Sequence, residues 1–315
     1  MTALDPAKQR ILVTGGTGFL GKHVLSNLES SSARVLPVGS KDYDLTDQIS
    51  VKQMFCDLSP TVVVHLAASC GGISANVENP GKFIHDNLIM GLLLLEESRL
   101  HRLNKFVLIS TTCAYPKNAP LPLHEDSIWS GKPVGATGPY GIAKRSLHEA
   151  CSAYHKQYGL NSSVLIPANL YGPGDHFDEN RSHVVPALIR RIVKAHNDGQ
   201  DEVVNWGTGK PTREFLHVTD AAEAIRRAVE KDTSATPINL GTGVETSIKS
   251  LTNVIAQVVG YQGRISWDTT KPDGQPRRFL DITRAKEILG FEPKIGLLEG
   301  IEQTVEWYMT RGCAN

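Results

Sequence analysis

The sequence has no excess of charge of either sign, no long apolar run and few cysteines. Lysine plus arginine and aspartate plus glutamate both number 33 in the 315 residues, so the formal net charge is +0. A neutral chain gives no support for bulk binding to nucleic acid or to an anionic membrane. No apolar run approaches the about 20 residues that cross a bilayer. The polar stretch Met1–Arg10 lacks the apolar core of a secretory signal.

The cysteines are odd in number and scattered, at Cys56, Cys70, Cys113, Cys151 and Cys313. Such a set makes a poor disulfide framework. We therefore expect a protein of the reducing cytoplasm. There a cysteine either packs as a small apolar residue or does chemistry as a thiol.

The first half of the chain alternates strand-like and helix-like segments. The expected strands are short and β-branched, and helix-like segments lie between them. Together they are the strands Ile11–Val13, Val35–Val38, Val62–Leu66, Phe106–Ile109 and Ser163–Ile166 and the helices Gly21–Leu28, Ser50–Asp57 and Phe83–Arg99. This alternation predicts an α/β fold of the Rossmann type, with a doubly wound parallel sheet.

After Asn169 the pattern loosens, and we expect a smaller, mostly C-terminal α/β region that packs on the first and closes a cleft. Tyr171–Ser182 is rich in Gly, Asp and Asn and is predicted to be a loop. The expected helices are Val184–Ala195, Ile248–Val259 and Leu297–Met309, and the expected strands are Glu214–Val218, Ile238–Leu240 and Ile265–Trp267. Thr219 or Asp220 would cap the helix that follows the first of these strands.

A glycine-rich turn, Thr14–Gly21, follows the first strand directly and opens a helix. Glycines at 15, 18 and 21 allow a tight turn, close approach of the backbone to a pyrophosphate and close packing of the helix on the strand. An ordinary strand–helix loop is the alternative. The position within a βαβ pattern favours a dinucleotide site at Gly15, Thr17, Gly18, Phe19, Leu20 and Gly21.

The end of the second strand bears on the choice between NAD and NADP. An NAD site usually offers an acid there for the ribose 2′-hydroxyl. This chain has Ser40 and Lys41, which suit a 2′-phosphate, so NADP is favoured, although Lys41 as a solvated loop residue is the alternative. Asp44 either borders the adenine or caps a helix. The small side chains of Leu66–Ala68 would let the cofactor lie close to the third strand, or serve only core packing.

Three side chains after the fourth strand indicate proton transfer. Tyr140 and Lys144 are one helical turn apart, and Thr111 follows the strand Phe106–Ile109. A lysine ammonium beside a phenol is predicted to lower its pKa and to make proton exchange feasible near neutral pH. Cys113 is the unusual neighbour, because hydride transfer needs no thiol. A cysteine there is more often a small buried residue, and a lone histidine such as His183 is more often structural.

These motifs, with others over almost the whole chain, resemble the extended short-chain dehydrogenase/reductases that act on nucleotide sugars, and within them the GDP-L-fucose synthase family. The most specific matches are Gly71–Asn76 and Ser182–Leu188. The others are His65–Ala68, Cys113–Pro116, Pro139–Lys144, Asn169–Pro173, Trp206–Gly209, Arg213–Val218 and Lys271–Gly274.

The resemblance implies NADP(H)-dependent 3,5-epimerisation and 4-reduction of GDP-4-keto-6-deoxy-D-mannose to GDP-L-fucose. By position it assigns the hydride step to Thr111, Tyr140 and Lys144, with threonine where the family usually has serine, and Tyr140 and Lys144 also contact the cofactor. Cys113 and His183 match the epimerisation pair. The nucleotide-sugar site falls on Asn169, His183, Arg191, Trp206, Arg213 and Lys271.

The chemistry of these residue types agrees with that assignment. A 4-keto group acidifies the hydrogens at C3 and C5, and inversion needs a base on one face and an acid on the other. Cys113 would take the proton and His183 would return it. Arg191 and Arg213 would clamp the diphosphate or lie solvated, with Arg190 as a competing candidate. Trp206 would stack on the ligand or pack in the core.

The chain departs from the family pattern at Pro173–Phe177, Ala168 and Ser69–Cys70, where the sugar is expected. The alternative functions are therefore an epimerase or reductase of another keto-deoxy sugar nucleotide, or an NADP-binding regulatory protein. Residues 1–168 and 214–242 are expected to bind the cofactor, and residues 169–213 and 243–315 the nucleotide sugar. Phe83–Arg99 and Tyr140–Gln157 resemble a helix pair that forms homodimers in this superfamily.

Overall fold

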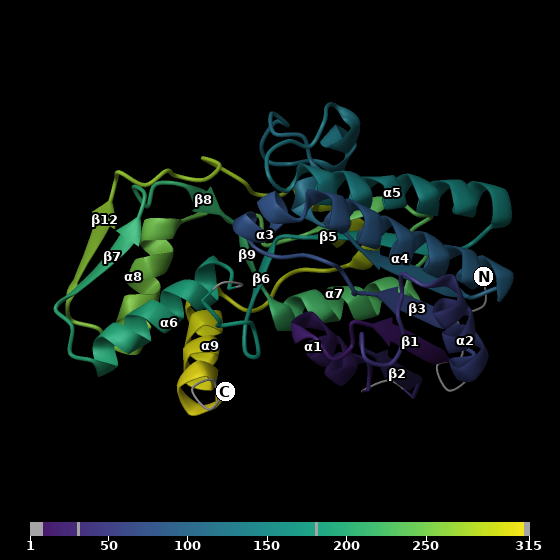
Figure 1. Ribbon diagram of the computed structural model, residues 1–315, viewed down its shortest axis with the longest axis horizontal. Helices are drawn as coiled ribbons and strands as arrows, with labels where there is room; N and C mark the ends of the chain where they lie inside the picture. The colour runs from purple at the N-terminus through teal and green to yellow at the C-terminus, as the bar shows by residue number, and fades with distance from the viewer. Residues whose placement is uncertain (1–8, 30–31, 180–181, 312–315) are drawn as a thin grey trace.

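The computed structural model describes residues 9–29, 32–179 and 182–311, so residues 1–8 and Cys313 of the sequence analysis lie outside it. A parallel six-stranded sheet in the order β10–β5–β4–β3–β1–β2 forms the centre (Figure 1). Its strands are β1 (Arg10–Thr14), β2 (Arg34–Val38), β3 (Val62–His65), β4 (Lys105–Ile109), β5 (Ser162–Pro167) and β10 (Pro237–Leu240). The sheet confirms the predicted Rossmann-type fold.

The strands are apolar throughout because both faces of the sheet are covered. Successive side chains point to opposite faces. Val13 and the strand side chains on the same face of the sheet pack on α1 (Phe19–Leu28) and α7 (Val218–Glu230). Leu12 and the strand side chains on the opposite face pack on a second set of helices. That second set is α2 (Gln48–Leu58), α4 (Pro80–Leu100) and α5 (Gly138–Tyr158). Figure 1 shows α4 and α5 on one side of the sheet and α1 and α7 on the other.

The strand order creates a crevice between β1 and β3. From β1 the chain crosses to β2 at one edge of the sheet and then returns to β3 on the other side of β1. The connections that leave the carboxyl ends of these two neighbouring strands therefore diverge, and such a point is where open α/β sheets bind ligands.

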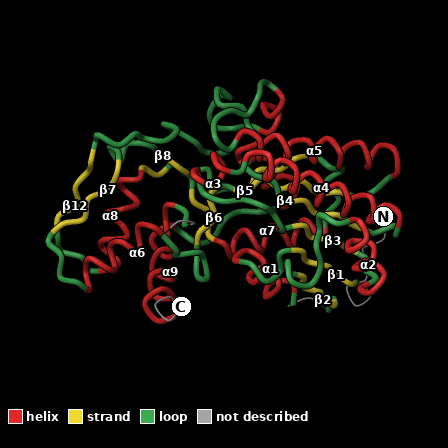
Figure 2. The backbone as a smooth tube through the Cα atoms, viewed as in Figure 1, coloured by secondary structure: helices red, strands yellow, loops and turns green. Residues whose placement is uncertain are grey.

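A second core lies beyond the carboxyl ends of the strands (Figure 2). It joins α6 (Val184–Asn197), α8 (Ile248–Val259) and α9 (Leu297–Arg311) to the pair β7 (Glu202–Trp206) and β12 (Arg264–Asp268). The remaining strands pair as β6 (Asn169–Tyr171) with β9 (Phe215–His217) and β8 (Thr212–Arg213) with β11 (Thr246–Ser247). The short helices are α3 (Ile73–Glu78), η2 (Thr112–Ala114), η3 (Glu125–Trp129) and η4 (Ala285–Leu289).

The predicted cap of α7 is wrong. The helix begins at Val218, and the side chain of His217 accepts from the backbone N–H of Thr219 at 3.4 Å. Asp220 lies inside the first turn, and its carboxylate accepts from the backbone N–H groups of Lys294 and Ile295 at 3.0 and 2.9 Å. Asp220 therefore binds the backbone of a segment that is distant in the sequence.

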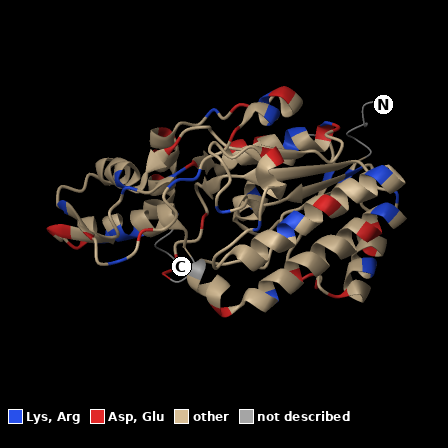
Figure 3. Cartoon of the chain, turned by 90° about the horizontal axis from the view of Figure 1, so that it is seen from above, with Lys and Arg blue, Asp and Glu red and all other residues tan. Residues whose placement is uncertain are grey.

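Positive and negative side chains are interspersed over the helices (Figure 3), in keeping with the balanced composition. Every helix among the described residues is too short or too polar to cross a membrane.

Candidate active site

The glycine-rich turn forms one wall of a cavity at the crevice between β1 and β3. Gly15 has φ +70, and a Cβ there would lie 2.9 Å from the amide nitrogen of Ala67, so only glycine fits. A Cβ on Gly21 would collide with the carbonyl oxygen of Gly15. Gly18 is the N-cap of α1 and has no side chain to accept a hydrogen bond from the first turn of the helix. The first N–H groups of α1 are therefore available to an anion.

The cavity has a volume of about 490 Å³, and nine of the twelve predicted cofactor residues line it, whereas Lys41, Tyr140 and Lys144 do not. The predicted residues that do so are Gly15, Thr17, Gly18, Phe19, Leu20, Gly21, Leu66, Ala67 and Ala68. Asp44 also lines it, while its carboxylate accepts from the N–H and hydroxyl of Thr46. The closely approaching backbone of the glycine-rich turn and the open end of α1 fit a dinucleotide.

The end of β2 lines this cavity with Val38, Gly39 and Ser40, none of which carries a carboxylate. Lys41 is exposed and is not a lining residue. Asp42 accepts from the backbone N–H of Gly39 at 2.7 Å. The hydroxyl of Ser40 is therefore the polar side chain that this strand end presents to the ligand.

Tyr140 and Lys144 lie in the first two turns of α5, as predicted, but their electrostatics differ from the prediction. Lys144 is buried, and its Nζ donates to the carbonyl oxygen of Ile109 at 3.0 Å. Burial lowers the pKa of Lys144 to about 8. The pKa of Tyr140 is raised well above its ordinary value, by burial first and then by the thiols of Cys70 and Cys113. The predicted lowering of this pKa is wrong in this structure, because desolvation dominates.

Thr111 and Cys113 are joined in one short turn. Thr111 is the N-cap of η2, two residues beyond the end of β4, and its Oγ1 accepts from the backbone N–H of Cys113 at 3.2 Å. That bond uses the oxygen as an acceptor and leaves the hydroxyl hydrogen free to donate. The turn therefore holds a hydroxyl donor and a thiol in a fixed relation.

A second cavity, of about 410 Å³, contains part of the predicted substrate site. Cys113, Asn169 and Arg213 all line it. The amide of Asn169 donates to the carbonyl oxygen of Glu214 at 3.0 Å, and Arg213 donates to the carbonyl oxygen of Gln275. The structure thus brings the thiol together with a cation and an amide from the second region of the chain.

Three other predicted substrate residues lie outside both cavity linings. Trp206 is 72% exposed, so the core alternative for this side chain is wrong. Lys271 Nζ lies 5.8 Å from the centre of the Trp206 ring. Arg191 donates to Asn205 Oδ1 at 2.7 Å, next to Trp206 in β7. The substrate-binding roles of these three residues stay predictions.

His183 is the N-cap residue of α6 and is exposed, with His176 nearby. Desolvation by the surrounding protein first, and then His176, lower its pKa. Within the described ranges no hydrogen bond joins His183 to Cys113, so the predicted acid/base pair stays a prediction. His183 lines neither cavity, whereas His176, with which it interacts, lines the cofactor cavity.

Asp175 is a buried acid in the loop that follows β6. Its Oδ1 accepts from the backbone N–H of His176 at 2.7 Å, whereas Oδ2 is buried without a hydrogen-bond partner. Burial raises its pKa to about 7. The folded carboxyl therefore holds its proton at pH values where the unfolded one, with a pKa of about 3.9, has lost it. Stability contributed by this group is present at low pH and lost as the pH rises toward 7.

We expect Asp175→Asn to remove this dependence. Between pH 5 and 8, wild type should lose about 2 kcal/mol of unfolding free energy relative to the variant, because asparagine does not ionise. Chemical denaturation of both proteins at the two pH values measures the difference. Parallel behaviour of wild type and variant would contradict it.

Sequence reasoning missed several residues of the site. Cys70 lies at the cofactor cavity and acts electrostatically on Tyr140. Arg278 lines the second cavity beside Cys113. Ser110 and His148 are buried behind Lys144 and share a hydrogen bond of 2.5 Å. The departure at Ser69–Cys70 was a usable signal for the first, whereas nothing in the sequence pattern marked the others.

Known proteins resemble this chain over nearly its full length. It is 36% identical to GDP-L-fucose synthase 1 of Arabidopsis thaliana, covering 99% of this chain and 97% of that protein. A GDP-L-fucose synthetase of Naegleria fowleri bound to NADP superposes with a TM-score of 0.91 at 30% identity, covering 99% and 96% of the two chains. A GDP-6-OMe-4-keto-L-xylo-heptose reductase of C. jejuni gives 0.90 at 28% identity, covering 98% and 99%.

The family match covers the sheet and residues that line both cavities. Residues 11–241 match the family described as NAD dependent epimerase/dehydratase. This range begins in β1, includes the glycine-rich turn, Thr111, Cys113, Tyr140 and Lys144, and ends just after β10. By this match, and by its relatives at more than 30% identity, the chain belongs to the NAD dependent epimerase/dehydratase family.

Proposed function

We propose that this chain is an NADPH-dependent enzyme that epimerises C3 and C5 of GDP-4-keto-6-deoxy-D-mannose and reduces C4, giving GDP-L-fucose. The observation that carries the proposal is the turn in which the Thr111 oxygen accepts from the N–H of Cys113. It puts an epimerase's thiol and a reductase's hydroxyl at the end of one strand. The named functions of the similar proteins support the same choice.

NADPH, when bound in the cavity at the crevice, supplies the hydride. The glycine-rich turn and the open end of α1 would hold the pyrophosphate, and Ser40, with Lys41 beside it, the 2′-phosphate. Leu66, Ala67 and Ala68 would pack against the cofactor, and Tyr140 and Lys144 would contact it at the reacting end. The relative from Naegleria fowleri, which was solved with NADP, supports this cofactor.

Cys113 is the base of the epimerisation in this proposal. Its thiolate removes the proton from a carbon that flanks the ketone, and the electron pair of the C–H bond moves into an enolate whose charge lies on the ketone oxygen. His183 then returns a proton to the same carbon from the opposite face. The hydroxyl of Thr111 and the phenol of Tyr140 donate hydrogen bonds to the oxygen throughout.

Tyr140 is the acid of the reduction. Its raised pKa keeps the phenol protonated at neutral pH, and a protonated group is what reduction of a ketone requires. As C4 is reduced, the phenol gives its proton to the C4 oxygen. Lys144 holds its ammonium beneath the site through the bond to Ile109.

Residues 169–213 and 243–315 would bind the nucleotide sugar, and residues 1–168 and 214–242 the cofactor. Asn169 and Arg213, which line the second cavity, would hold the substrate near Cys113. The exposed ring of Trp206, with Lys271 beside it, and the cation of Arg191 would bind the nucleotide part.

Incubation with NADPH and GDP-4-keto-6-deoxy-D-mannose tests the proposal. We expect NADPH oxidation that is coupled to formation of GDP-L-fucose, and slower oxidation with NADH because Ser40 and Lys41 favour a phosphate. Epimerised ketone without NADPH oxidation would indicate an epimerase alone. The heptose reductase among the structural relatives supports a second candidate, a reductase of another keto sugar nucleotide, which turnover of only such a substrate would favour.

We also propose that two copies associate through α4 and α5 and that the enzyme works in the cytoplasm. The two helices pack side by side and expose Leu92, Leu100 and Tyr158. The described cysteines, Cys56, Cys70, Cys113 and Cys151, form no disulfide. A monomer in light scattering would contradict the dimer, and an extracellular protein in fractionation would contradict the compartment.

A further inference from the structure

The turn that carries Cys113 is held by a segment far away in the sequence. Arg278 Nη2 donates to the carbonyl oxygen of Thr112 at 2.8 Å across a separation of 166 residues. Arg278 also lines the second cavity together with Cys113. The segment that contains it runs from β12 back toward the central sheet, so the second region of the chain reaches into the catalytic turn.

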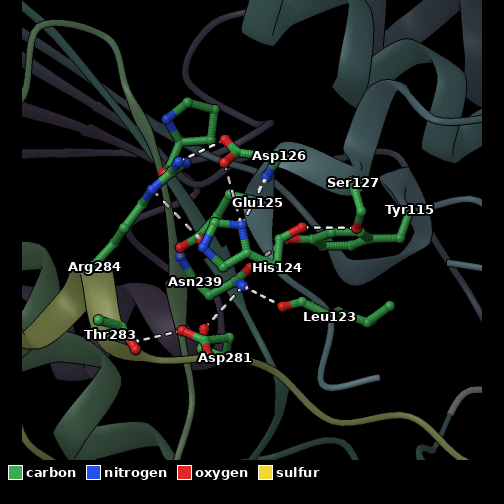
Figure 4. Close-up of polar contacts among 11 residues, drawn as sticks. Tyr115, Leu123, His124, Glu125, Asp126, Ser127, Asn239, Asp281, Thr283 and Arg284 are labelled. Carbon is green, nitrogen blue, oxygen red and sulfur yellow. Dashed lines mark hydrogen bonds and ion pairs between the residues drawn. The ribbon is translucent and has the colours of Figure 1, made fainter. Parts of the chain in front are cut away.

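The other side of the turn is fixed to the same segment through Tyr115 (Figure 4). The Tyr115 hydroxyl donates to Asn239 Oδ1 at 2.7 Å. The Asn239 amide donates to the carbonyl oxygens of Leu123 and Asp281 at 2.8 and 3.0 Å, and its backbone N–H donates to the buried carboxylate of Glu125. The turn is therefore clamped on both sides, by Arg278 on one and by Tyr115 on the other.

Arg278 has no carboxylate partner within the part of the chain that the structure describes. Its neighbour Arg277 pairs with Glu245 at 2.7 Å, and Arg284 pairs with Asp126 at 2.5 Å. Arg278 is less exposed than Arg277 and interacts with Cys113 and Tyr115, and burial lowers its pKa. A partly buried guanidinium stays charged and is costly without a counter-charge.

We propose that Arg278 is the positioning residue of the epimerisation: it fixes the Cys113 turn and supplies the positive charge against which the Cys113 thiolate forms. This inference rests on the proposed function. Cys113 interacts electrostatically with the thiol of Cys70 after β3, the phenol of Tyr140 on α5 and the guanidinium of Arg278. Lys144, also on α5, is a second cation of the site and interacts with Cys70. Arg278 is the cation that interacts with Cys113 and also bonds its turn, and a nearby cation favours a thiolate.

The test measures how fast the C3 and C5 hydrogens of GDP-4-keto-6-deoxy-D-mannose exchange with D2O. NADP⁺ is present, so no hydride is available, and mass spectrometry follows the exchange across a range of pH. For Arg278→Gln we expect an about tenfold slower exchange near neutral pH. Its KM for the sugar nucleotide should stay near the wild-type value, because Arg278 acts on the catalytic turn. Arg278→Lys should restore most of the wild-type profile.

Matched variants separate this role from a structural one. Arg277→Gln removes the same charge one position earlier, where the side chain is 57% exposed, and should leave the profile unchanged. Tyr115→Phe loosens the other side of the turn and should also slow exchange without raising KM. A higher KM for Arg278→Gln with an unchanged maximal exchange rate would overturn the inference and assign Arg278 to substrate binding. No exchange by wild type would instead overturn the proposed function.

Discussion

Cys113→Ser is expected to stop the exchange of the C3 and C5 hydrogens with solvent while leaving the ketone reducible. Serine is close in size, and the backbone N–H at position 113 would still donate to Thr111 Oγ1, so the turn is preserved. A serine hydroxyl, however, ionises far less readily than a thiol and is a poor base. Loss of a general base costs on the order of 10²–10⁴ in rate, and we expect an effect in that range.

Deuterium incorporation in the presence of NADP⁺ measures the exchange, and oxidation of NADPH measures the reduction. The matched control is Cys56→Ser, which changes an exposed thiol on α2 outside both cavities. It should exchange at the wild-type rate. If Cys113→Ser also formed the L-configured sugar at the wild-type rate, the base would be another residue. Cys70, the second thiol in electrostatic contact with Tyr140, would be the first to replace next.

Tyr140→Phe is expected to slow reduction by on the order of 10²–10⁴, the range for a missing general acid. Phenylalanine keeps the ring in its place on the first turn of α5 and removes only the hydroxyl. The raised pKa keeps the phenol protonated. Loss of this proton should therefore not slow wild-type reduction as the pH rises from 6 to 9. Exchange at C3 and C5 should slow less, because Thr111 still donates to the ketone oxygen.

Single-turnover oxidation of NADPH with saturating substrate measures the reduction. Tyr154→Phe is the control on the same helix: its hydroxyl donates to Glu96 at 2.9 Å, outside both cavities. That variant should reduce at the wild-type rate. Reduction by Tyr140→Phe at the rate of this control would remove Tyr140 from the mechanism.

The cofactor half of the site could be predicted from sequence because its determinants are local. The turn from Gly15 to Gly21 needs glycine for reasons that involve its own backbone and the neighbouring strand. Apolar runs of strand length, separated by helical periodicity, define the sheet without knowledge of any distant contact. The predicted helices begin and end within a few residues of α1, α2 and α4 for the same reason.

The parts that sequence reasoning missed depend on contacts across the chain. His217 rather than Asp220 caps α7, because Asp220 is taken by the backbone of Lys294 and Ile295. The direction of the Tyr140 pKa follows from how much protein surrounds the phenol, and the i, i+4 spacing to Lys144 does not report that. Arg278 reaches Thr112 across 166 residues, and no local pattern identifies such a partner.

The clamp on the cysteine turn also has a consequence for the order of assembly during translation. β10 completes the sheet after an excursion through the second region, and Arg278 and Asp281 follow only after β12. A ribosome that has released residues 1–240 has therefore delivered the whole sheet, the thiol and the Tyr115–Asn239 side of the clamp, but not Arg278. Domains tend to fold as they emerge, so the nascent chain would carry a cofactor site before Arg278 could fix the Cys113 turn, and the epimerase chemistry would mature last.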